Sequence, residues 1–326
     1  MYNNLLFDQR GMTFTMKNVT VIRNLSENIG KIIVGKKDTI ELLVIALLAG
    51  GNVLLEDVPG VGKTTLANAL AKSIDCGFTR IQFTPDTLPS DVTGLSVYNM
   101  QTGKFEFNKG AVMNNIILAD EINRTSPKTQ ASLLEAMEEK QITVDGNTYF
   151  LPSPFMVIAT QNPVDYLGTY SLPEAQLDRF LMKISIGYPS IEDEKSMVEL
   201  HIKGSVLKDL EPVTDGKTIS SMQDDVKNVK INPDLISYVI SIINETRTNP
   251  NLSLGASPRA TLAVIRAAQA VAYCDQRDYV ILDDIIKIIP SVLTHRLILS
   301  SEARINKMTA AKILSATVSR IPVPVL

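Results

Sequence analysis

The chain of 326 residues contains no tryptophan, only two cysteines and only two histidines. Cys76 and Cys274 lie far apart in the sequence, which excludes a disulfide framework and a four-cysteine zinc site. His201 and His295 have no cysteine or histidine neighbours at metal-ligand spacing, so we assign them no chemistry. A reducing compartment is the simplest setting for such a chain.

An excess of one charge and long apolar runs are also missing. The 32 lysines and arginines nearly balance the 35 aspartates and glutamates, which leaves a formal charge of -3. No bulk basic character therefore favours a nucleic acid or an anionic membrane as a partner. The longest apolar run, Leu42 to Ala49, is far shorter than the roughly 20 residues of a membrane span, and the first residues lack the apolar stretch of a signal peptide. We expect a cytoplasmic protein without a membrane span.

What the chain does contain is typical of a folded protein of about two domains, with 45% hydrophobic and 21% charged residues. Helix-like spacing of Val, Ile and Leu over 20–32 and 37–50 precedes a short apolar run, a loop with glycines and a further helix. Short apolar runs without alternation indicate strands that are covered on both faces, as in a parallel sheet. The expected strands are 53–56, 116–119, 155–159 and, as a further candidate, 184–186.

Two segments between these strands have the signature of antiparallel hairpins, with turns at Thr102-Gly103 and at Asp145-Gly146. From about Pro189 the strand signals stop and helical patterns follow. The expected helices are 191–203, 232–247, 258–274, 282–293 and 307–318, with 204–231 as an irregular connection. We therefore divide the chain into residues 1–188, of which 1–18 are expected to be flexible, and residues 189–326.

The run from Asp57 to Thr64 lies between the first strand and the following helix, which is the place of a phosphate-binding loop. Gly60 and Gly62 let the backbone curl so that successive amides point at one anion. Lys63 can reach the β- and γ-phosphates of a nucleotide, and the Thr64 hydroxyl can ligate Mg²⁺. The alternative is an ordinary Pro-Gly turn, since Asp57 stands where the general pattern G-x-x-x-x-G-K-[ST] has its first glycine.

Asp120 and Glu121 follow four apolar residues, which places both carboxylates at the carboxyl end of a buried strand, where open α/β sheets bind ligands. Asp120 is expected to hold Mg²⁺ through its water shell, and Glu121 to orient and deprotonate an attacking water. The alternative, a solvated acidic turn, leaves two adjacent carboxylates that repel each other without a cation. The glycine loop upstream favours the metal site.

Three further side chains suit a site for an anion. Asn162 follows the third strand and is expected near the γ-phosphate, where its amide can hold the water; an Asn-Pro turn is the alternative. Arg259 lies in the first turn of a helix, where a cation opposes the helix dipole unless an anion is near; an exposed arginine that bends away is the alternative. Arg179 follows a helix and can instead pair with Asp178 or Glu174.

Taken in this order, the motifs resemble those of the AAA+ ATPases, and more closely those of their MoxR family, over roughly residues 20–320. The segments that carry the resemblance are 54–64, 119–124 with Pro127-Lys128, 159–163, 172–180 and 255–260. The resemblance implies an α/β fold, namely a P-loop NTPase αβα core with a parallel sheet, followed by an all-helical C-terminal lid domain. It also implies that ATP binds between the two domains and that the active form is a ring, usually a hexamer.

The same resemblance implies a role for each motif. Residues 57–65 correspond to Walker A, Asp120 and Glu121 to Walker B, Asn162 to sensor 1, Arg259 to sensor 2, and Arg179 to the arginine finger that completes a neighbouring subunit's site. Lys63, Mg²⁺ and Arg259 of one chain, with Arg179 of a neighbour, are then expected to absorb charge on the γ-phosphate. The implied catalytic residues are Glu121, Asn162, Arg179 and Arg259, and the implied magnesium ligands are Thr64 and Asp120. The expected nucleotide-binding residues are Asp57, Val58, Pro59, Gly60, Val61, Gly62, Lys63, Thr64, Thr65, Val34 and Gly35.

The hairpins near 94–112 and 141–154 resemble inserts typical of the clade that includes MoxR proteins. Their aromatic side chains either contact a client or adaptor, or pack the hairpins onto their own domain; they are Tyr98, Phe105, Phe107, Tyr149 and Phe150.

We therefore predict a Mg²⁺-dependent ATPase that remodels or matures other proteins. By the resemblance, its partners are further copies of itself, a client protein and a von Willebrand factor A domain protein. A DNA-directed AAA+ motor is an alternative, against which the acidic balance and the absence of a basic run argue. A non-hydrolysing, ATP-dependent scaffold is another, against which Glu121 argues.

Overall fold

The computed structural model of the chain describes residues 5–7, 13–58, 60–161, 170, 172–202 and 207–324. Pro59 and Asn162, two of the expected site residues, therefore lie outside the described residues. Within the first 18 residues, expected to be flexible, β1 (Leu5–Phe7) pairs with β2 (Thr13–Thr15) in antiparallel fashion. The first helix, α1, spans Met16–Gly30.

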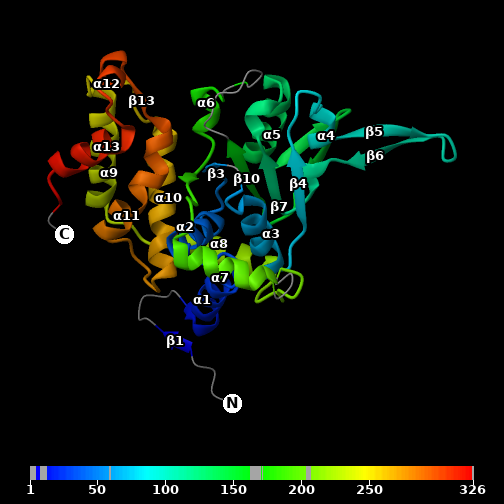
Figure 1. Cartoon of the computed structure of the whole chain (residues 1–326), viewed down its shortest axis with the longest axis horizontal. Coiled ribbons are helices and arrows are strands. Elements are labelled where there is room, and N and C mark those ends of the chain that lie inside the picture. Colours follow the sequence, from blue (N-terminus) through cyan, green and yellow to red (C-terminus); the bar gives the residue numbers. More distant parts are fainter. Residues whose placement is uncertain are drawn as a thin grey trace.

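A parallel sheet of five strands forms the centre of the molecule, in the order β11-β3-β10-β7-β4 (Figure 1). Its strands are β3 (Val53–Glu56), β4 (Phe78–Gln82), β7 (Ile116–Asp120), β10 (Met156–Gln161) and β11 (Met182–Ile184). Sequence reasoning missed β4 because this edge strand has a mostly uncovered, mixed pattern, Phe-Thr-Arg-Ile-Gln, and no continuous apolar run.

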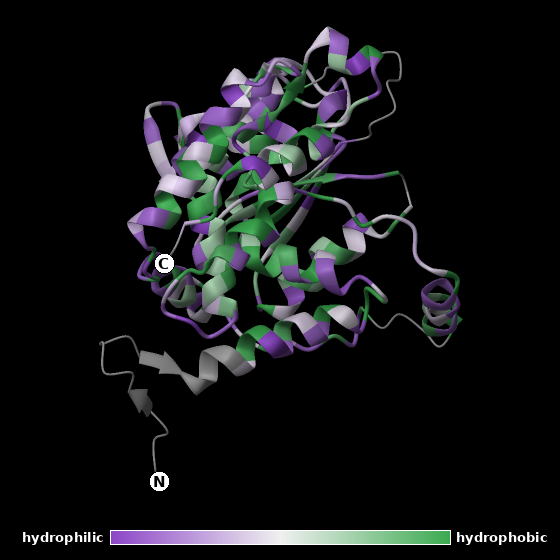
Figure 2. Cartoon of the chain, turned by 90° about the vertical axis from the view of Figure 1, so that its left-hand side faces the viewer, coloured by the Kyte–Doolittle hydropathy of each residue, from purple (hydrophilic) through white to green (hydrophobic). Residues whose placement is uncertain are grey.

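Alternate residues of each central strand belong to different hydrophobic cores, as the pleat requires. On one face lie Ile116, Leu118, Met156 and Ile158, and on the other lie Ile117, Ala119, Val157 and Ala159. The first core is covered by α1, α2 (Lys37–Leu48), α3 (Lys63–Ser73) and helices of the C-terminal part. The second is covered by α4 (Pro89–Thr93) and α5 (Pro127–Glu139). Figure 2 shows hydrophobic segments through the interior and hydrophilic ones around them.

Both expected hairpins are present. The longer one, β5 (Gly94–Asn99) with β6 (Lys104–Lys109), projects from the body of the molecule (Figure 1), and the shorter one pairs β8 (Gln141–Val144) with β9 (Asn147–Phe150). The rings of Phe107 and Tyr149 stack with their centroids 4.0 Å apart, which joins the two hairpins. Phe105 and Phe150 are 74% and 76% exposed. Of the hairpin aromatic residues, Phe107 and Tyr149 therefore pack the hairpins together, whereas Phe105 and Phe150 are exposed to solvent.

The C-terminal part is mostly helical and contains α7 (Ile191–Ile202), α8 (Gly216–Lys227), α9 (Pro233–Thr248), α10 (Pro258–Cys274), α11 (Leu282–Leu293), α12 (Ser301–Ile305) and α13 (Ala310–Arg320). Two corrections follow. The lid is not wholly helical, because β12 (Leu252–Leu254) pairs with β13 (Ile298–Leu299). The connection 204–231 is not irregular throughout, since α8 lies within it.

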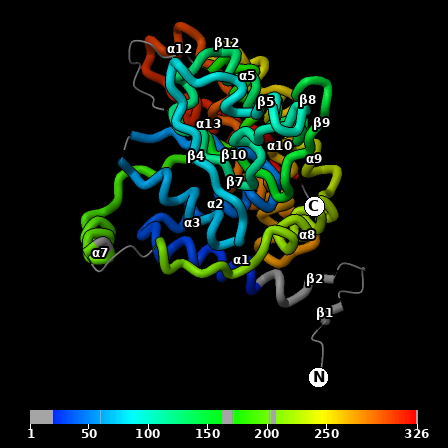
Figure 3. Tube along the Cα trace, turned by 90° about the vertical axis from the view of Figure 1, so that its right-hand side faces the viewer, coloured from blue at the N-terminus to red at the C-terminus, as the bar shows by residue number. Residues whose placement is uncertain are grey.

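Helix α8 escaped prediction because only three of its side chains are buried, Ile219, Met222 and Val226, and the rest of the segment is polar. The Asp215 carboxylate begins the helix by accepting a hydrogen bond of 2.7 Å from the amide of Thr218. The buried side chains of α8 join the core that also holds α2 and α10. In contrast, α7 stands at the periphery of the molecule (Figure 3).

The division of the chain into two domains at residue 188 stays a prediction.

Short elements complete the fold: the helix α6 (Glu174–Leu177) and the 3-10 turns η1 (Ala111–Met113), η2 (Ile122–Arg124) and η3 (Thr294–Arg296). Among the helices that the structure describes, none combines the length and the apolar character that crossing a membrane requires.

Candidate functional site

The loop after β3 has the backbone conformation of an anion cradle. Gly60 and Gly62 adopt φ angles of 87° and 90°, in the left-handed region that favours glycine. Helix α3 begins at Lys63, so the amides of its first turn have no carbonyl of the same helix to bond. Together with the positive end of the helix dipole, these free donors make the loop a site for phosphate groups.

Asp57 holds this loop to the strand at the sheet edge. Its carboxylate is buried and accepts hydrogen bonds from the Ser185 hydroxyl at 3.1 Å, the Gly187 amide at 3.1 Å and the Ile186 amide. Its main-chain carbonyl accepts a 2.8 Å bond from Nζ of Lys63. The Asp57 side chain is therefore turned to residues 185–187 and positions the loop, whereas it was expected among the nucleotide contacts.

The two carboxylates after the buried strand lie in a connected hydrogen-bond network. The Thr160 hydroxyl donates to Oδ1 of Asp120 at 2.6 Å and accepts a 2.8 Å bond from the amide of Glu121. Arg80 donates to Oδ2 of Asp120 from Nη2 at 2.6 Å and from Nε at 3.1 Å. Neighbouring strands thus fix Asp120 at the carboxyl edge of the sheet, with its charge balanced by a single guanidinium.

The Glu121 side chain is held separately from that of Asp120. Its Oε2 accepts bonds from Nε2 of Gln82 at 3.0 Å and from Nη1 of Arg124 at 2.9 Å. Glu121 itself has a φ of 55°, a conformation that is strained for a residue with a Cβ and that turns the chain sharply out of the strand.

A cavity of about 400 Å³ brings the predicted residues together. It is lined by Gly60, Gly62, Lys63, Thr64, Thr65, Asp120 and Glu121, and also by Arg80, Gln82 and Thr160. Sequence reasoning missed the last three. The polar residues on either side of Ile81 are the signal that could have placed Arg80 and Gln82 on one face of a strand, where the Arg80 guanidinium donates to the Gln82 side chain.

The donor set fits a hard cation such as Mg²⁺. The Thr64 hydroxyl and the Asp120 carboxylate face the same cavity and supply oxygen ligands. In the part of the chain that the structure describes, no three His, Cys, Asp or Glu side chains gather as a metal site. An ion here would therefore take most of its ligands from phosphate groups and water, as Mg²⁺ commonly does.

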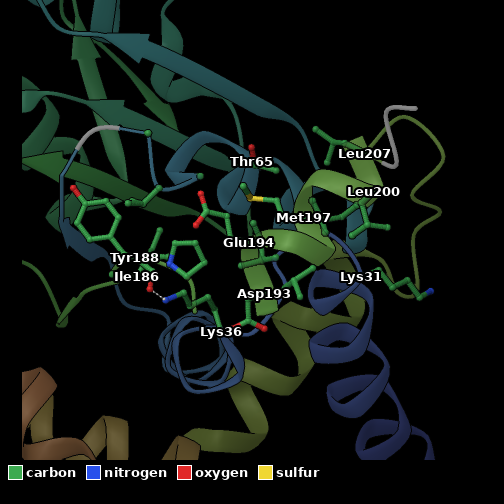
Figure 4. Close-up of a pocket in the computed structure, with 18 residues that line it drawn as sticks. Lys31, Lys36, Thr65, Ile186, Tyr188, Asp193, Glu194, Met197, Leu200 and Leu207 are labelled. Carbon is green, nitrogen blue, oxygen red and sulfur yellow. Dashed lines mark hydrogen bonds between the residues drawn. The ribbon is translucent and has the colours of Figure 1, made fainter. Parts of the chain in front are cut away.

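A second cavity, of about 560 Å³, opens on the other side of the same loop (Figure 4). Val34 and Tyr188 line it, and Glu194 and Met197 of α7 lie opposite Thr65 at the start of α3. Gly35 was expected beside Val34 among the nucleotide contacts. The Asp193 carboxylate of α7 lies so close to Gly35 that any side chain at this position would collide with it, so the packing of α7 requires a glycine there. The cavity is mainly apolar and adjoins the loop, which suits the base of a nucleotide.

Arg179 and Arg259 lie together in a third cavity, of about 310 Å³, which we call the arginine cavity. Arg179 Nη1 is 3.2 Å from Oε2 of Glu138, and Arg259 Nη2 pairs with the other oxygen of the same carboxylate. Gly50, Gly51 and Asn52, which precede β3, also line the cavity.

The arginine cavity is at the amino edge of the sheet, whereas the phosphate loop is at the carboxyl edge. The four residues of β3 alone separate the two by about 13 Å, at roughly 3.3 Å per residue. Arg259 was expected to act with Lys63 of the same chain. In the described arrangement neither arginine lines the cavity of the loop, and Arg259 lies beside Arg179 instead.

Hydrogen bonds to Asp178 connect the segment after α6, which holds Arg179, to the C-terminal part of the chain. Arg296 is buried and donates from Nε to Oδ1 of Asp178 at 2.7 Å, and its Nη2 donates to the carbonyls of Asp178 and Phe180. The Ser257 hydroxyl donates to Oδ2 of Asp178 at 2.7 Å. Both arginines are therefore held on one unit formed by the loop after α6 and the start of α10.

Comparison with known proteins agrees with this architecture. Residues 52–182 match the ATPase family associated with various cellular activities (AAA), and residues 244–317 match the AAA lid domain. The chain is 39% identical to Chaperone MoxR1 of Mycobacterium tuberculosis over 90% of this chain and 80% of that protein. It is 52% identical to YeaC, an uncharacterized protein of Bacillus subtilis, over 92% and 93%. The crystal structure of a predicted ATPase from Cytophaga hutchinsonii is similar with a TM-score of 0.88 and 38% identity, over 94% and 96%.

Proposed function

Because the chain belongs to the MoxR family of AAA+ ATPases, we propose that it hydrolyses ATP with Mg²⁺ at the interface between neighbouring copies in a ring, with six copies as the expected number. The observation that carries this proposal is the separation of two half-sites within one chain. The phosphate loop and the carboxylates lie at one edge of the sheet, and Arg179 and Arg259 lie at the other. Neither half is complete alone, and a second copy supplies the missing half.

In the proposed complex the triphosphate lies on the loop and the first turn of α3. Lys63 leaves the Asp57 carbonyl, its present acceptor at 2.8 Å, and donates to the β- and γ-phosphates. The base enters the apolar cavity beside Val34 and Tyr188. Thr64 and Asp120 would hold Mg²⁺, which would supply positive charge to the phosphate groups.

Glu121 is the proposed general base. It accepts a proton from the attacking water, and Asn162, which lies outside the described residues, is the predicted second contact of that water. Arg179 and Arg259 of the neighbouring copy exchange Glu138 for the γ-phosphate and stabilise the charge that develops there. Gln82 and Arg124 currently bind the Glu121 carboxylate, so they must release it before it acts as a base.

The proposed work of this cycle is remodelling or maturation of other proteins, a role supported by the relative named Chaperone MoxR1. The exposed aromatic residues of the hairpins, Tyr98, Phe105 and Phe150, are proposed contacts for a client, and a von Willebrand factor A domain protein is the proposed adaptor.

We place this activity in the reducing cytoplasm, which suits the two unpaired cysteines of the chain, Cys76 and Cys274. Burial raises the pKa values of their thiols to about 11 and about 12, so both thiols stay protonated.

The test is a Glu121→Gln chain supplied with ATP and Mg²⁺. We expect it to bind ATP, to release phosphate at least a hundredfold more slowly than the wild type, and to retain a client from an extract of the native cell. ATP binding by both chains, with phosphate release by the wild type no faster than by Glu121→Gln, would support a non-hydrolysing scaffold instead. Hydrolysis that rises on adding DNA, and falls again with salt, would support a DNA-directed motor.

A further inference from the structure

Two features of the position of Lys140, its backbone conformation and the burial of its ammonium group, are unfavourable for a lysine. It ends α5 with a φ of 53°, where glycine is the usual residue. Its Nζ is buried, 4.9 Å from the centre of the Phe155 ring, and has no hydrogen-bond partner among the described residues. The ring offers a cation–π contact, but a buried ammonium without a hydrogen-bond acceptor still costs free energy, so the packing explains this side chain only in part.

The surroundings of Lys140 have a surplus of positive charge. The arginine cavity is lined by five cationic side chains and two carboxylates, although the whole chain is acidic; the cationic residues are Lys140, Arg179, Arg259, Arg266 and Arg296, and the acidic ones are Asp178 and Glu138. Nε of Arg179 is a second buried donor without a partner in the described part of the chain. Burial first, and Arg266 second, lower the pKa of Lys140 to about 8. An anion with several acceptor oxygens would satisfy these donors and balance the charge.

We propose that the Lys140 side chain turns from the Phe155 ring into the arginine cavity and donates to the terminal phosphate group of the ATP bound by the neighbouring copy, beside Arg179 and Arg259. This inference rests on the proposed function. The chain's own phosphate loop lies at the opposite edge of the sheet, so the phosphate must come from a second copy. Lys140 then acts as a catalytic residue in trans, and the cost of burying its charge is recovered when the phosphate arrives.

Rings of mixed subunits test the proposal. Lys140→Gln and Glu121→Gln chains are co-expressed with different tags and purified through both tags. The Lys140→Gln subunits keep an intact loop and Glu121, whereas the Glu121→Gln subunits cannot hydrolyse ATP but offer an intact Lys140. We expect pure Lys140→Gln rings to turn over roughly tenfold to a hundredfold more slowly than wild type, and mixed rings to exceed both pure forms.

Three companion measurements make the result decisive. Arg179→Ala mixed with Glu121→Gln tests the shared site of the proposed function, Lys140→Arg keeps the charge and should restore most of the turnover, and Lys312→Met removes an exposed lysine of α13. Ring size and circular dichroism are checked for each chain, and Lys140→Met replaces Lys140→Gln if the latter does not fold.

The outcomes separate the two proposals. Recovery in both mixtures supports Lys140 as a group that acts on a neighbour. Recovery with Arg179→Ala but not with Lys140→Gln, or full turnover of pure Lys140→Gln rings, overturns the role of Lys140 and leaves the proposed function standing. Recovery in neither mixture overturns both.

Discussion

Arg179 and Arg259 meet on the two oxygens of one carboxylate, that of Glu138, although a large part of the chain separates them in sequence. Five cationic side chains and two carboxylates line the cavity that holds this pair, so the cavity retains positive potential at the edge of the sheet opposite the chain's own phosphate loop. A nucleotide held by a second copy is the anion that this arrangement fits.

Replacing Arg179 separates binding from hydrolysis. We expect Arg179→Ala to bind ATP with nearly wild-type affinity, because the loop is untouched, and to hydrolyse it about 10³–10⁵ times more slowly, as for other arginine fingers. Affinity is measured by nucleotide titration and turnover by phosphate release. Full turnover at saturating ATP would remove Arg179 from the site.

Asp57→Gly restores the general loop pattern but should impair the protein. The substitution leaves the amides of Ile186 and Gly187 without their acceptor, at about 1–3 kcal/mol each if they stay buried, and frees the loop from residues 185–187. We expect ATP affinity to fall at least tenfold. Ser185→Ala, which removes one hydroxyl donor, is the matched control and should change affinity much less. Equal ATP binding by Asp57→Gly and the wild type would show that the carboxylate has no positioning role.

Lys140 should make stability depend on pH in the alkaline range. Its pKa is about 8 in the folded chain and returns to about 10.4 on unfolding. Between these values the unfolded chain binds more protons, so the free energy of unfolding rises with pH, by about 3 kcal/mol over the window. Below pH 8 the full cost of the buried charge is present.

Denaturant unfolding of the nucleotide-free chain at pH 7.5 and pH 9.5 measures this effect against Lys140→Met. We expect the wild type to gain stability relative to the variant at the higher pH. A difference between the two chains that stays constant would contradict the buried state of the ammonium.

The bond between Asp178 and Arg296 should contribute strongly to stability. Asp178→Ala leaves the Arg296 guanidinium buried without its counter-ion, which typically costs about 3–5 kcal/mol. Ser257→Ala removes a single donor to Asp178 and the cap of α10, so a loss of about 1–2 kcal/mol is expected. Both are measured by denaturant unfolding. Equal effects of the two substitutions would mean that Arg296 finds another partner.

The hairpin aromatic residues should divide into two groups. Phe105→Ser is expected to lower the free energy of unfolding by no more than about 1 kcal/mol, because the ring is 74% exposed and its aromatic contact is an edge-on one with Tyr98. Phe107→Ala breaks the stack with Tyr149 and should cost about 1–3 kcal/mol. In the Glu121→Gln background, Phe105→Ser should lower the yield of captured client. An unchanged yield would exclude Phe105 from the client surface.

Local patterns predicted much of the fold and of one half of the site. Continuous apolar runs at 116–119 and 155–159 indicated strands covered on both faces, and the glycines after β3 indicated the phosphate loop. Edge strand β4 and helix α8 were missed because each has few buried side chains, so tertiary contacts outweigh a weak local signal.

The sequence by itself determined the phosphate loop, because strand, glycine loop and helix are adjacent in the chain and their spacing fixes where Lys63 emerges. It also placed Asp120 and Glu121 at the carboxyl end of a buried strand, because four apolar residues precede them. Only the tertiary structure decided where Arg179, Arg259 and Lys140 lie, since elements distant in sequence bring them to one cavity at the amino edge of the sheet. It also decided that the Asp57 carboxylate binds residues 185–187. The physical reason is that a local pattern sets the direction of a side chain on its own element, whereas its partner depends on which elements pack together.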